Sequence, residues 1–471
     1  MKKDFLWGAA TSNVQAEGAY LEDGKGLNVY DTLVVTPEPG IEPMFCDTSV
    51  AVDHYHHYKE DIDLMAEMGF KAYRFSVVWS RINPMGDDEP NEKGLAYYED
   101  MVDYLNEKGI EPVVSLVHFD MPDNLMRKYN GFLNKQVIGF FEKHVEAVVN
   151  RLKGKVRYWL TYNEINYSFH MPNLVSGAIK PEDMSNAELF GQLTVNLLVA
   201  HSVATEVIKR IDPNAKVGGM CGSAPFYPMT CKPGDMRASQ LRMEMGTYLM
   251  FDAMTSGELP AYFTSFLKNR NVKVDFSEEE KELLKKASKD LDYLAFSYYQ
   301  SGVAQDIPEI TDELEKEDAL LYTFSRLRNP YLSANEWGWQ IDPDGLRYLL
   351  NDYYHRYRKP LFIVENGIGI DEKLVDGKVY DDARIDYHAK HIAALKAAVD
   401  VDGVDLLGYL AWSPFDFLSS HKEIRKRYGF VYVNRGFDDL MDMKRYRKKS
   451  FYWYKKVIAS NGEDLKNDVE Y

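Results

Sequence analysis

The stretch KAYRFSVVW (residues 71–79) contains the element from which the predicted fold is built. It follows residues 52–68, where apolar side chains recur at helical spacing, and Gly69 ends that helical pattern. The stretch itself is rich in aromatic and β-branched residues, which is typical of a buried strand. The sequence therefore predicts a helix, a glycine stop and a buried strand, in that order.

This helix–stop–strand unit recurs along the chain. Further helices are predicted over residues 97–108, 136–153, 187–210, 278–289, 344–358 and 384–400. The other predicted strands are FLWGAATS (5–12), EPVVSLVHF (111–119), KVRYWLTYNE (155–164), KVGGMCG (216–222), LDYLAFSYY (291–299), LFIVENG (361–367) and VDLLGYLAWSPFD (404–416). Eight strands that alternate with helices indicate a parallel sheet with right-handed crossovers.

Eight such units favour a closed (β/α)8 TIM barrel over a doubly wound open sheet, because neither a GxGxxG nor a GxxxxGK loop is present. No linker divides the chain, so residues 1–471 are predicted to form a single domain. Residues 222–275 and 301–342 lack the repeating pattern. We expect them to be long, irregular loops that elaborate the C-terminal face of the barrel.

Composition restricts the classes of function. Lys and Arg number 56 against 73 Asp and Glu, and a net charge of −17 argues against a nucleic-acid partner. The three cysteines form no CxxC pair, which suggests a reducing compartment. No apolar run is long enough for a signal peptide or a membrane span, so we expect a cytoplasmic protein. The cluster His54, His56 and His57 lacks a partner motif, and no metal or cofactor is predicted.

Two strand ends carry a glutamate beside an asparagine. They are TYNE (161–164), on the fourth predicted strand, and VENG (364–367), on the seventh. In a barrel the carboxyl ends of the strands converge on one mouth, so Glu164 and Glu365 should face each other there. Two carboxyls roughly 5–5.5 Å apart suit retaining glycoside hydrolysis, in which one protonates the leaving oxygen and the other attacks the anomeric carbon.

At this point the chain resembles glycoside hydrolase family 1. Besides TYNE and VENG, the matching motifs are FLWGAATSNVQAEG (5–18), RFSVVWSRI (74–82), HFDMP (118–122), WSPFD (412–416) and RYGFVYV (427–433). The resemblance extends from Phe5 to about Tyr454. It implies that Glu164 is the general acid/base and Glu365 the nucleophile.

The resemblance also implies roles for neighbours of the two glutamates. Arg74 and Tyr299 would contact Glu365, and an adjacent guanidinium would keep that carboxyl ionised. In substrate binding, Asn163 would bond the sugar 2-hydroxyl, while Gln15 and His118 would hold other hydroxyls of the glycone, the sugar that is released.

Two tryptophans complete the implied sugar site. Trp412 would stack beneath the glycone, and Trp339 would line the side that receives the aglycone. Alternation along a strand predicts that Tyr298 is a core residue while Tyr299 points into the barrel.

The loop LSSHKEIRKRYGF (418–430) gathers cations in an acidic chain. Family members that act on unphosphorylated sugars carry a glutamate at the position of Ser419, whereas members acting on 6-phosphorylated sugars resemble the S-x6-K-x-Y arrangement of Ser419, Lys426 and Tyr428. An ammonium and two hydroxyls suit a phosphate dianion. We interpret these three residues as a phosphate clamp. Three further cations would either steer anions or face solvent: Lys422, Arg425 and Arg427.

The glycone epimer is less strongly indicated. Ser420 is small, as in the 6-phospho-β-glucosidases, where 6-phospho-β-galactosidases tend to carry Trp. The loop from Trp412 to Tyr428 is one residue shorter than in many 6-phospho-β-glucosidases, and Ser297 lacks the amide that helps hold the aglycone side in other members. Glucose is favoured, and activity on both epimers remains open.

The sequence therefore predicts a retaining hydrolase of 6-phospho-β-D-glucosides, such as cellobiose 6-phosphate or aryl β-glucoside 6-phosphates. Such small-molecule substrates arise when a phosphotransferase system imports sugars, which agrees with a cytoplasmic enzyme. Three alternatives are a 6-phospho-β-galactosidase or dual-specificity enzyme, an ordinary β-glucosidase, and a sugar-phosphate binder without catalysis. A homo-oligomer is possible, and no membrane or nucleic-acid partner is expected.

Overall fold

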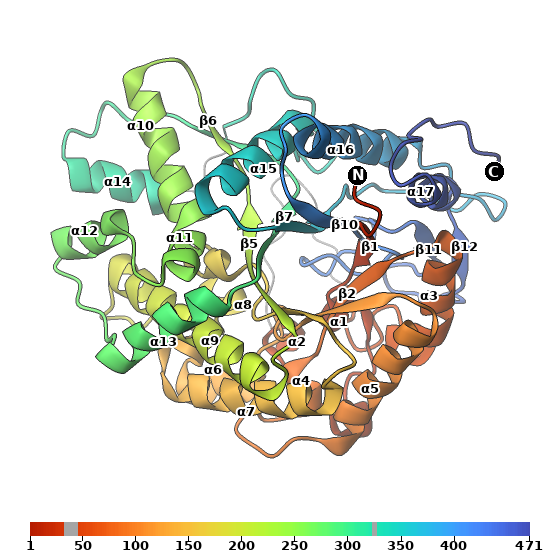
Figure 1. Ribbon diagram of the computed structural model, residues 1–471, viewed down its shortest axis with the longest axis horizontal. Helices are drawn as coiled ribbons and strands as arrows, with labels where there is room; N and C mark the ends of the chain where they lie inside the picture. The colour runs from red at the N-terminus through yellow and green to blue at the C-terminus, as the bar shows by residue number, and fades with distance from the viewer. Residues whose placement is uncertain (33–45, 323–326) are drawn as a thin grey trace.

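A computed structural model describes residues 1–32, 46–322 and 327–471 of the chain (Figure 1). Its centre is a closed barrel of eight strands in the order β1-β10-β9-β7-β5-β4-β3-β2. Every neighbouring pair in the barrel is parallel. The strands are β1 (Leu6–Ala10), β2 (Ala72–Ser76), β3 (Glu111–Ser115), β4 (Tyr158–Leu160), β5 (Lys216–Ser223), β7 (Tyr293–Tyr298), β9 (Leu361–Asn366) and β10 (Leu406–Trp412). The predicted TIM barrel is confirmed, and each strand lies within its predicted stretch except β5, which extends one residue further, to Ser223.

The predicted helices surround this barrel. They are α3 (His54–Met68), α5 (Glu92–Glu107), α7 (Gln136–Leu152), α9 (Asn186–Ile211), α13 (Glu278–Asp290), α15 (Pro343–Tyr357) and α16 (Asp382–Asp400). Gly69 ends α3 in the left-handed conformation (φ 84°), where glycine has no steric penalty. Helix α5 begins before the predicted residue 97, because the Asn91 side chain accepts a hydrogen bond from the backbone N–H of Lys93 and caps the helix.

The expectation of irregular loops at 222–275 and 301–342 was wrong. These segments contain α10 (Pro233–Arg242), the π-helix η4 (Met243–Tyr248), α11 (Leu249–Ser256), α12 (Ala261–Asn269) and α14 (Glu313–Tyr322). Strands β6 (Phe226–Pro228) and β8 (Gly302–Ala304) pair with each other. Residues 323–326 of the second segment lie outside the described residues. The described elements pack around an apolar cluster, which includes Leu241, Phe263, Phe266 and Phe190 of α9.

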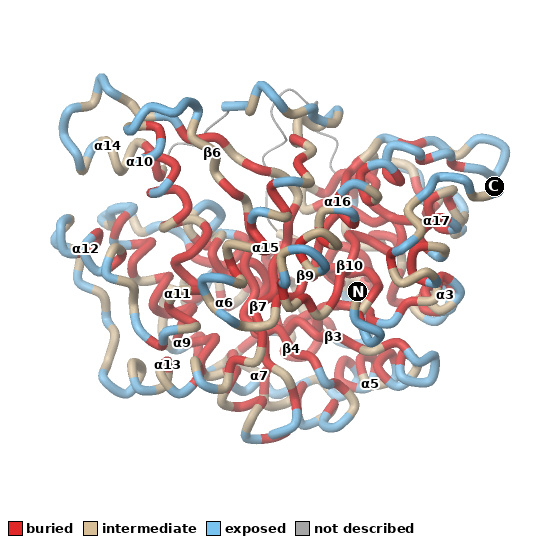
Figure 2. The backbone as a smooth tube through the Cα atoms, turned by 45° about the horizontal axis from the view of Figure 1, so that its top comes forward, coloured by how far each residue is buried: buried red, intermediate tan, exposed pale blue. Residues whose placement is uncertain are grey.

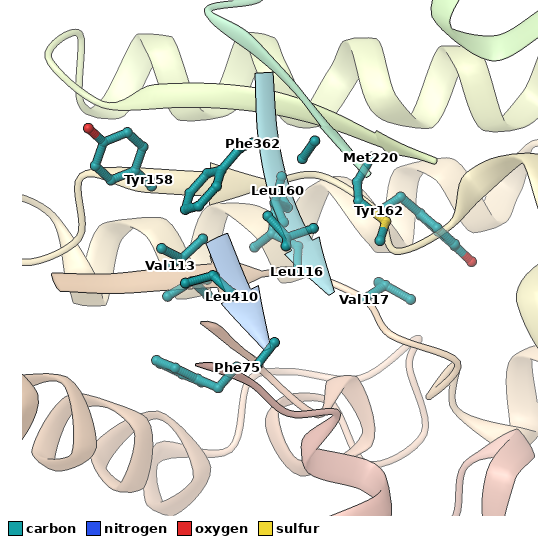
Figure 3. Packing of buried hydrophobic residues seen from close by; sticks show 14 of the residues in the cluster. Phe75, Val113, Leu116, Val117, Tyr158, Leu160, Tyr162, Met220, Phe362 and Leu410 are labelled. Atoms are coloured by element: carbon teal, nitrogen blue, oxygen red, sulfur yellow. The ribbon is translucent and has the colours of Figure 1, made fainter. Parts of the chain in front are cut away.

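Apolar side chains fill the interior of the molecule. Figure 2 shows that buried residues concentrate in the barrel, while exposed residues lie on the outer helices and loops. Phe75, Val113, Leu160, Phe362 and Leu410, from five different strands, pack together inside (Figure 3). Because burying a polar side chain in this apolar lining costs free energy, the ends of the strands are the favourable positions for polar residues.

The chain after β10 forms a short hairpin and a last helix that packs among the outer helices. Strand β11 (Val431–Val433) pairs antiparallel with β12 (Arg445–Arg447), and α17 (Lys449–Ala459) packs against α3 and α16. The loop 418–430 runs between β10 and this hairpin. Within the ranges that the structure describes, no helix is both long and apolar enough to cross a membrane.

Candidate active site

The two glutamates lie at the carboxyl ends of their strands, in the barrel mouth. Glu365 is part of β9, and Glu164 stands between the end of β4 and the short helix η3 (Ile165–Phe169). Their exposed fractions are only 3% and 7%. The backbone of Glu164 is left-handed (φ 44°, ψ 48°), a conformation that is uncommon outside glycine and asparagine. Two carboxyls are thus buried where an unpaired charge is costly.

Glu365 is held by a cation and a phenol. Arg74 of β2 is fully buried and donates from Nη1 to Oε1 of Glu365. Tyr299 donates from Oη to Oε2 of the same carboxylate at 2.7 Å. Arg74 also donates to Asn163 Oδ1 at 2.6 Å and to Ser115 Oγ at 2.9 Å, so its position is fixed by neighbouring strands. Both expected contacts with Glu365 are therefore present.

Glu164 has a different environment. Ser297 of β7 donates from Oγ to Oε1 of Glu164. Among the residues that the structure describes, no Lys or Arg forms an ion pair with Glu164. Burial and the nearby charge of Glu365 raise the pKa of Glu164 to about 8, against the opposing effects of the Ser297 hydrogen bond and Arg74. The Glu164 carboxyl therefore keeps its proton at neutral pH.

Burial also raises the pKa of Glu365, and Arg74 and Tyr299 act to lower it. Because only Glu365 touches a cation, it is the carboxyl that ionises first. One protonated and one ionised carboxyl in the same mouth are the two forms that retaining glycoside hydrolysis needs.

Polar atoms without partners surround the carboxyls. Within the described part of the chain, His118 Nδ1 and Asn163 Nδ2 are buried and accept or donate no hydrogen bond. Burial, together with Arg74, lowers the pKa of His118 well below its usual value, so this ring is neutral. Trp412 lies 5.8 Å from the His118 ring, measured between centroids. A sugar with several hydroxyls would satisfy these buried groups.

Gln15 lies beside these groups at the base of the basic loop. It belongs to the short helix α1 (Asn13–Ala16) and donates from Nε2 to the carbonyl of Leu418 at 2.8 Å. The next residue along the loop, Ser419, accepts at Oγ from the backbone N–H groups of His421 and Glu423, both at 3.2 Å. Gln15 and Ser419 are therefore neighbours through the Leu418 backbone.

Lys426 and Tyr428 lie together at the other end of the loop. Both are buried, and both pack over Gly369, where a Cβ would stand 2.5 Å from Lys426 Cγ and 3.1 Å from Tyr428 Cζ. Lys426 Nζ lies 3.7 Å from the centroid of the Trp339 ring. A contact between Trp339 and the loop could not be predicted, because nothing in the local pattern links two residues so far apart. An ammonium group held over the face of an indole ring is in a position to bind an anion as well.

The other cations of the loop have different partners. Arg427 is buried and donates to Asp416 Oδ2 at 3.0 Å and to the carbonyls of Val433 and Arg435. Exposure to solvent, one of the two roles considered for Arg427, is therefore wrong, because the side chain is buried. It holds the loop instead.

Arg425 donates to Glu423 at 2.6 Å, and this pair is partly exposed. Lys422 Nζ reaches the carbonyl of Asp31 at 3.4 Å and lies 5.4 Å from the Tyr30 ring centroid. These two contacts give Lys422 and Arg425 structural partners.

Sequence reasoning missed the buried charges behind the loop. Arg384 of α16 donates to the carbonyls of Ile368, Arg427 and Tyr428. Lys448, which precedes α17, bridges Glu372 and Asp416, and the Asp416–Lys448 distance is 2.8 Å. Arg384 and Lys448 stand in no motif, so only the folded structure could associate them with the clamp residues.

The three clustered histidines do not converge. His54 Nδ1 lies 2.8 Å from Asp61 Oδ2, and His56 Nδ1 lies 2.6 Å from Asp53 Oδ1. His57 faces Glu60. In residues 1–32, 46–322 and 327–471, no group of three or more His, Cys, Asp or Glu side chains is arranged to hold a metal ion.

Comparison with known proteins identifies relatives that match along almost the full chain. The sequence model of glycosyl hydrolase family 1 matches residues 1–463. A 6-phospho-β-glucosidase of Clostridium longisporum is 44% identical, with 98% of each chain covered. A phospho-cellobiase of Klebsiella oxytoca is 42% identical at the same coverage.

A solved structure provides an independent comparison of the fold. The family 1 β-glucosidase of Thermotoga maritima superimposes with a TM-score of 0.85 at 30% identity, covering 98% of this chain and 99% of the other. The fold and the family resemblance inferred from the strand-end motifs are both confirmed.

Proposed function

This chain belongs to glycosyl hydrolase family 1, and on that premise we propose that it hydrolyses 6-phospho-β-D-glucosides with retention of configuration. The products are glucose 6-phosphate and an aglycone. The observation that carries the assignment of roles is the unequal pairing of the two buried carboxyls, because Arg74 and Tyr299 bond Glu365 while Glu164 meets only a serine hydroxyl.

In the first step Glu365 is the nucleophile. Its carboxylate attacks the anomeric carbon, while protonated Glu164 gives its proton to the glycosidic oxygen and the aglycone leaves. The Asn163 amide is suited to bond the sugar 2-hydroxyl, since Arg74 occupies its oxygen and leaves Nδ2 for the substrate. His118, Gln15 and Trp412 supply further contacts with the glycone.

In the second step Glu164 acts as a base, whereas in the first step it acts as an acid. Now ionised, it accepts a proton from a water molecule as that water attacks the anomeric carbon and the bond from this carbon to Glu365 breaks. Two inversions at the anomeric carbon give net retention. Glu164 must therefore hold a proton in the first step and be ionised in the second. In the free enzyme burial and the charge of Glu365 raise its pKa to about 8, and once Glu365 is esterified that charge is gone and the pKa of Glu164 falls.

The 6-phosphate is the group that the loop 418–430 recognises in this proposal. Lys426 supplies an ammonium, and Ser419 and Tyr428 supply hydroxyl donors. Ser419 supports this reading because a glutamate at that position would repel a dianion. A phosphorylated sugar does not cross a membrane unaided, so we place the reaction in the cytoplasm, where import with phosphorylation delivers it.

The test measures turnover of p-nitrophenyl β-glucoside with and without the 6-phosphate, and of the 6-phosphorylated galactoside, by the wild-type enzyme. We expect the phosphorylated glucoside to be cleaved with the highest kcat/KM. Faster cleavage of the plain glucoside would overturn the phosphate assignment while leaving the carboxyl pair intact. Faster cleavage of the phosphorylated galactoside would instead overturn the choice of epimer.

A further inference from the structure

Strand β7 and the residue that follows it supply one hydroxyl to each of the two carboxyls. Successive side chains of a strand point to opposite faces, so Ser297 and Tyr299 both point into the barrel while Tyr298 points outward. Tyr298 is fully buried and donates to the carbonyl of Asp342 at 2.6 Å. Ser297 donates to Glu164, and Tyr299 donates to Glu365. The Tyr299 contact is part of the assigned site, whereas Ser297 has no role in the mechanism so far.

The position of Ser297 is fixed from both sides. Its backbone is paired with Glu365 of β9 and with Gly222 of β5. Asn166, two residues after Glu164, accepts from the N–H of Gly222 and donates to its carbonyl, both at 2.8 Å. The segment that carries Glu164 is thus tied to the strand next to Ser297. Ser297 itself is 1% exposed, so little water competes for its hydroxyl.

We propose that Ser297 is a positioning residue that holds the Glu164 carboxylate by a hydrogen bond while Glu164 accepts a proton from the attacking water. This inference rests on the proposed function, because it concerns Glu164 as the acid/base. Ser297 therefore contributes a hydrogen bond of its own to Glu164, besides lacking the amide that other family members carry on the aglycone side.

The hydroxyl favours the ionised form of Glu164. A serine O–H can donate to a carboxylate, and after rotation its oxygen can accept from the protonated acid. The bond to the charged form is the stronger of the two, so it lowers the pKa of Glu164 against the effect of burial. Removal of the hydroxyl raises that pKa. The alkaline limb of the pH–rate profile, where Glu164 loses its proton, then moves to higher pH.

The experiment compares Ser297→Ala with Ser297→Thr and Ser223→Ala. Thr retains the hydroxyl. Ser223 is a buried serine of neighbouring β5 whose hydroxyl bonds Tyr353 at 2.7 Å, so Ser223→Ala makes the same chemical change away from the carboxyls. The readout is kcat/KM against pH for p-nitrophenyl β-glucoside 6-phosphate. We expect the alkaline limb of Ser297→Ala to rise by about one pH unit, and those of Ser297→Thr and Ser223→Ala to match wild type.

A second readout isolates the step in which the carboxylate acts. With a dinitrophenyl leaving group, departure needs no proton, so hydrolysis of the glycosyl-enzyme limits kcat. In the glycosyl-enzyme Glu365 is esterified and its charge no longer raises the pKa of Glu164, so the expected change is in the acid limb of this kcat: Ser297→Ala should move that limb, where Glu164 becomes protonated, to higher pH by about one unit. Rescue by Thr would separate the role of the hydroxyl from a general loss of packing.

The outcomes are distinguishable. An alkaline limb that does not move in folded Ser297→Ala overturns the inference and leaves the proposed function standing. If Ser297→Ala does not fold, Ser297→Cys takes its place, since a thiol is a weaker donor of similar size and should move the limb in the same direction by less. A wild-type enzyme without turnover of any phosphorylated glycoside overturns the proposed function itself.

Discussion

The environments of Glu164 and Glu365 differ in one decisive respect. Both side chains are buried in the same barrel mouth, and each receives a hydroxyl, from Ser297 of β7 and from Tyr299 just after it. Only Glu365 also receives a guanidinium, from Arg74. Burial raises the pKa of both carboxyls, so in the proposed mechanism this cation is what separates the nucleophile from the acid. Identical residue types acquire opposite roles from one neighbour.

The largest expected effect comes from removing the nucleophile. Glu365→Gly should lower kcat on the order of 10⁴-fold or more, and added azide should restore turnover with an α-glycosyl azide as product. The product is identified by NMR of the anomeric proton. Glu164→Gly is the matched variant, since azide there replaces water at the glycosyl-enzyme and gives a β-glycosyl azide. A β product from Glu365→Gly would reverse the two roles.

Replacing Arg74 removes the contact that distinguishes the environment of Glu365 from that of Glu164. Arg74→Met should lower kcat/KM by about 10²–10³-fold, because Glu365 loses its charge partner. Loss of that cation raises the pKa of Glu365, and since the nucleophile must be ionised, the acid limb of the pH profile moves to higher pH. Arg74→Lys keeps a positive charge but lacks the planar guanidinium, so its kcat/KM should lie between those of the wild type and Arg74→Met. An unmoved acid limb would show that Arg74 does not set the ionisation of Glu365.

Lys426→Met removes the clamp cation without touching the carboxyl pair. We expect kcat/KM for the phosphorylated glucoside to fall by about 10–10²-fold, while the rate on the plain glucoside and both pH limbs stay unchanged. Arg425→Met is the control, since Arg425 already pairs with Glu423. An equal loss on both substrates would mean that Lys426 supports the barrel mouth in general, through Trp339, and does not recognise phosphate.

The pH profile of the wild type gives the smallest effect and needs no variant. Above about pH 8, kcat/KM should fall by roughly tenfold per pH unit, because Glu164 loses the proton that the leaving oxygen needs. Initial rates between pH 5 and pH 10 would give the apparent pKa. A rate that stays constant up to pH 10 would contradict the assignment of Glu164 as the acid.

The barrel could be predicted because its strands are short, apolar and regularly interrupted. Each strand carries its own signal, as KAYRFSVVW does, and the helices between them show the 3.6-residue period. The segments 222–275 and 301–342 do not show this pattern because their helices are short and pack partly on one another and partly on α9 and β5. Local pattern does not reveal which surface an isolated helix covers.

The site was predictable where residues follow strands and hidden where contacts bridge distant segments. Glu164, Glu365 and Arg74 stand within or just after strands, so the barrel itself implies their convergence. The hydroxyl of Ser297 was visible in the sequence, but its partner depends on the register of β7 against β5 and β9. A one-residue shift would reverse which side chains face inward, and sequence alone does not fix that shift.

The closure of the barrel between β1 and β10 has a consequence for biosynthesis. The first strand pairs with the last one, from Leu6↔Gly408 to Ala10↔Trp412. A ribosome therefore releases β2, the other neighbour of β1, and the segment with Glu164 long before β10 exists. Until β10 emerges, β1 and β9 each have an open edge, which is a site for wrong pairing. The barrel cannot close, and the mouth that holds Glu164 and Glu365 is not complete, before residues 406–412 have been synthesised.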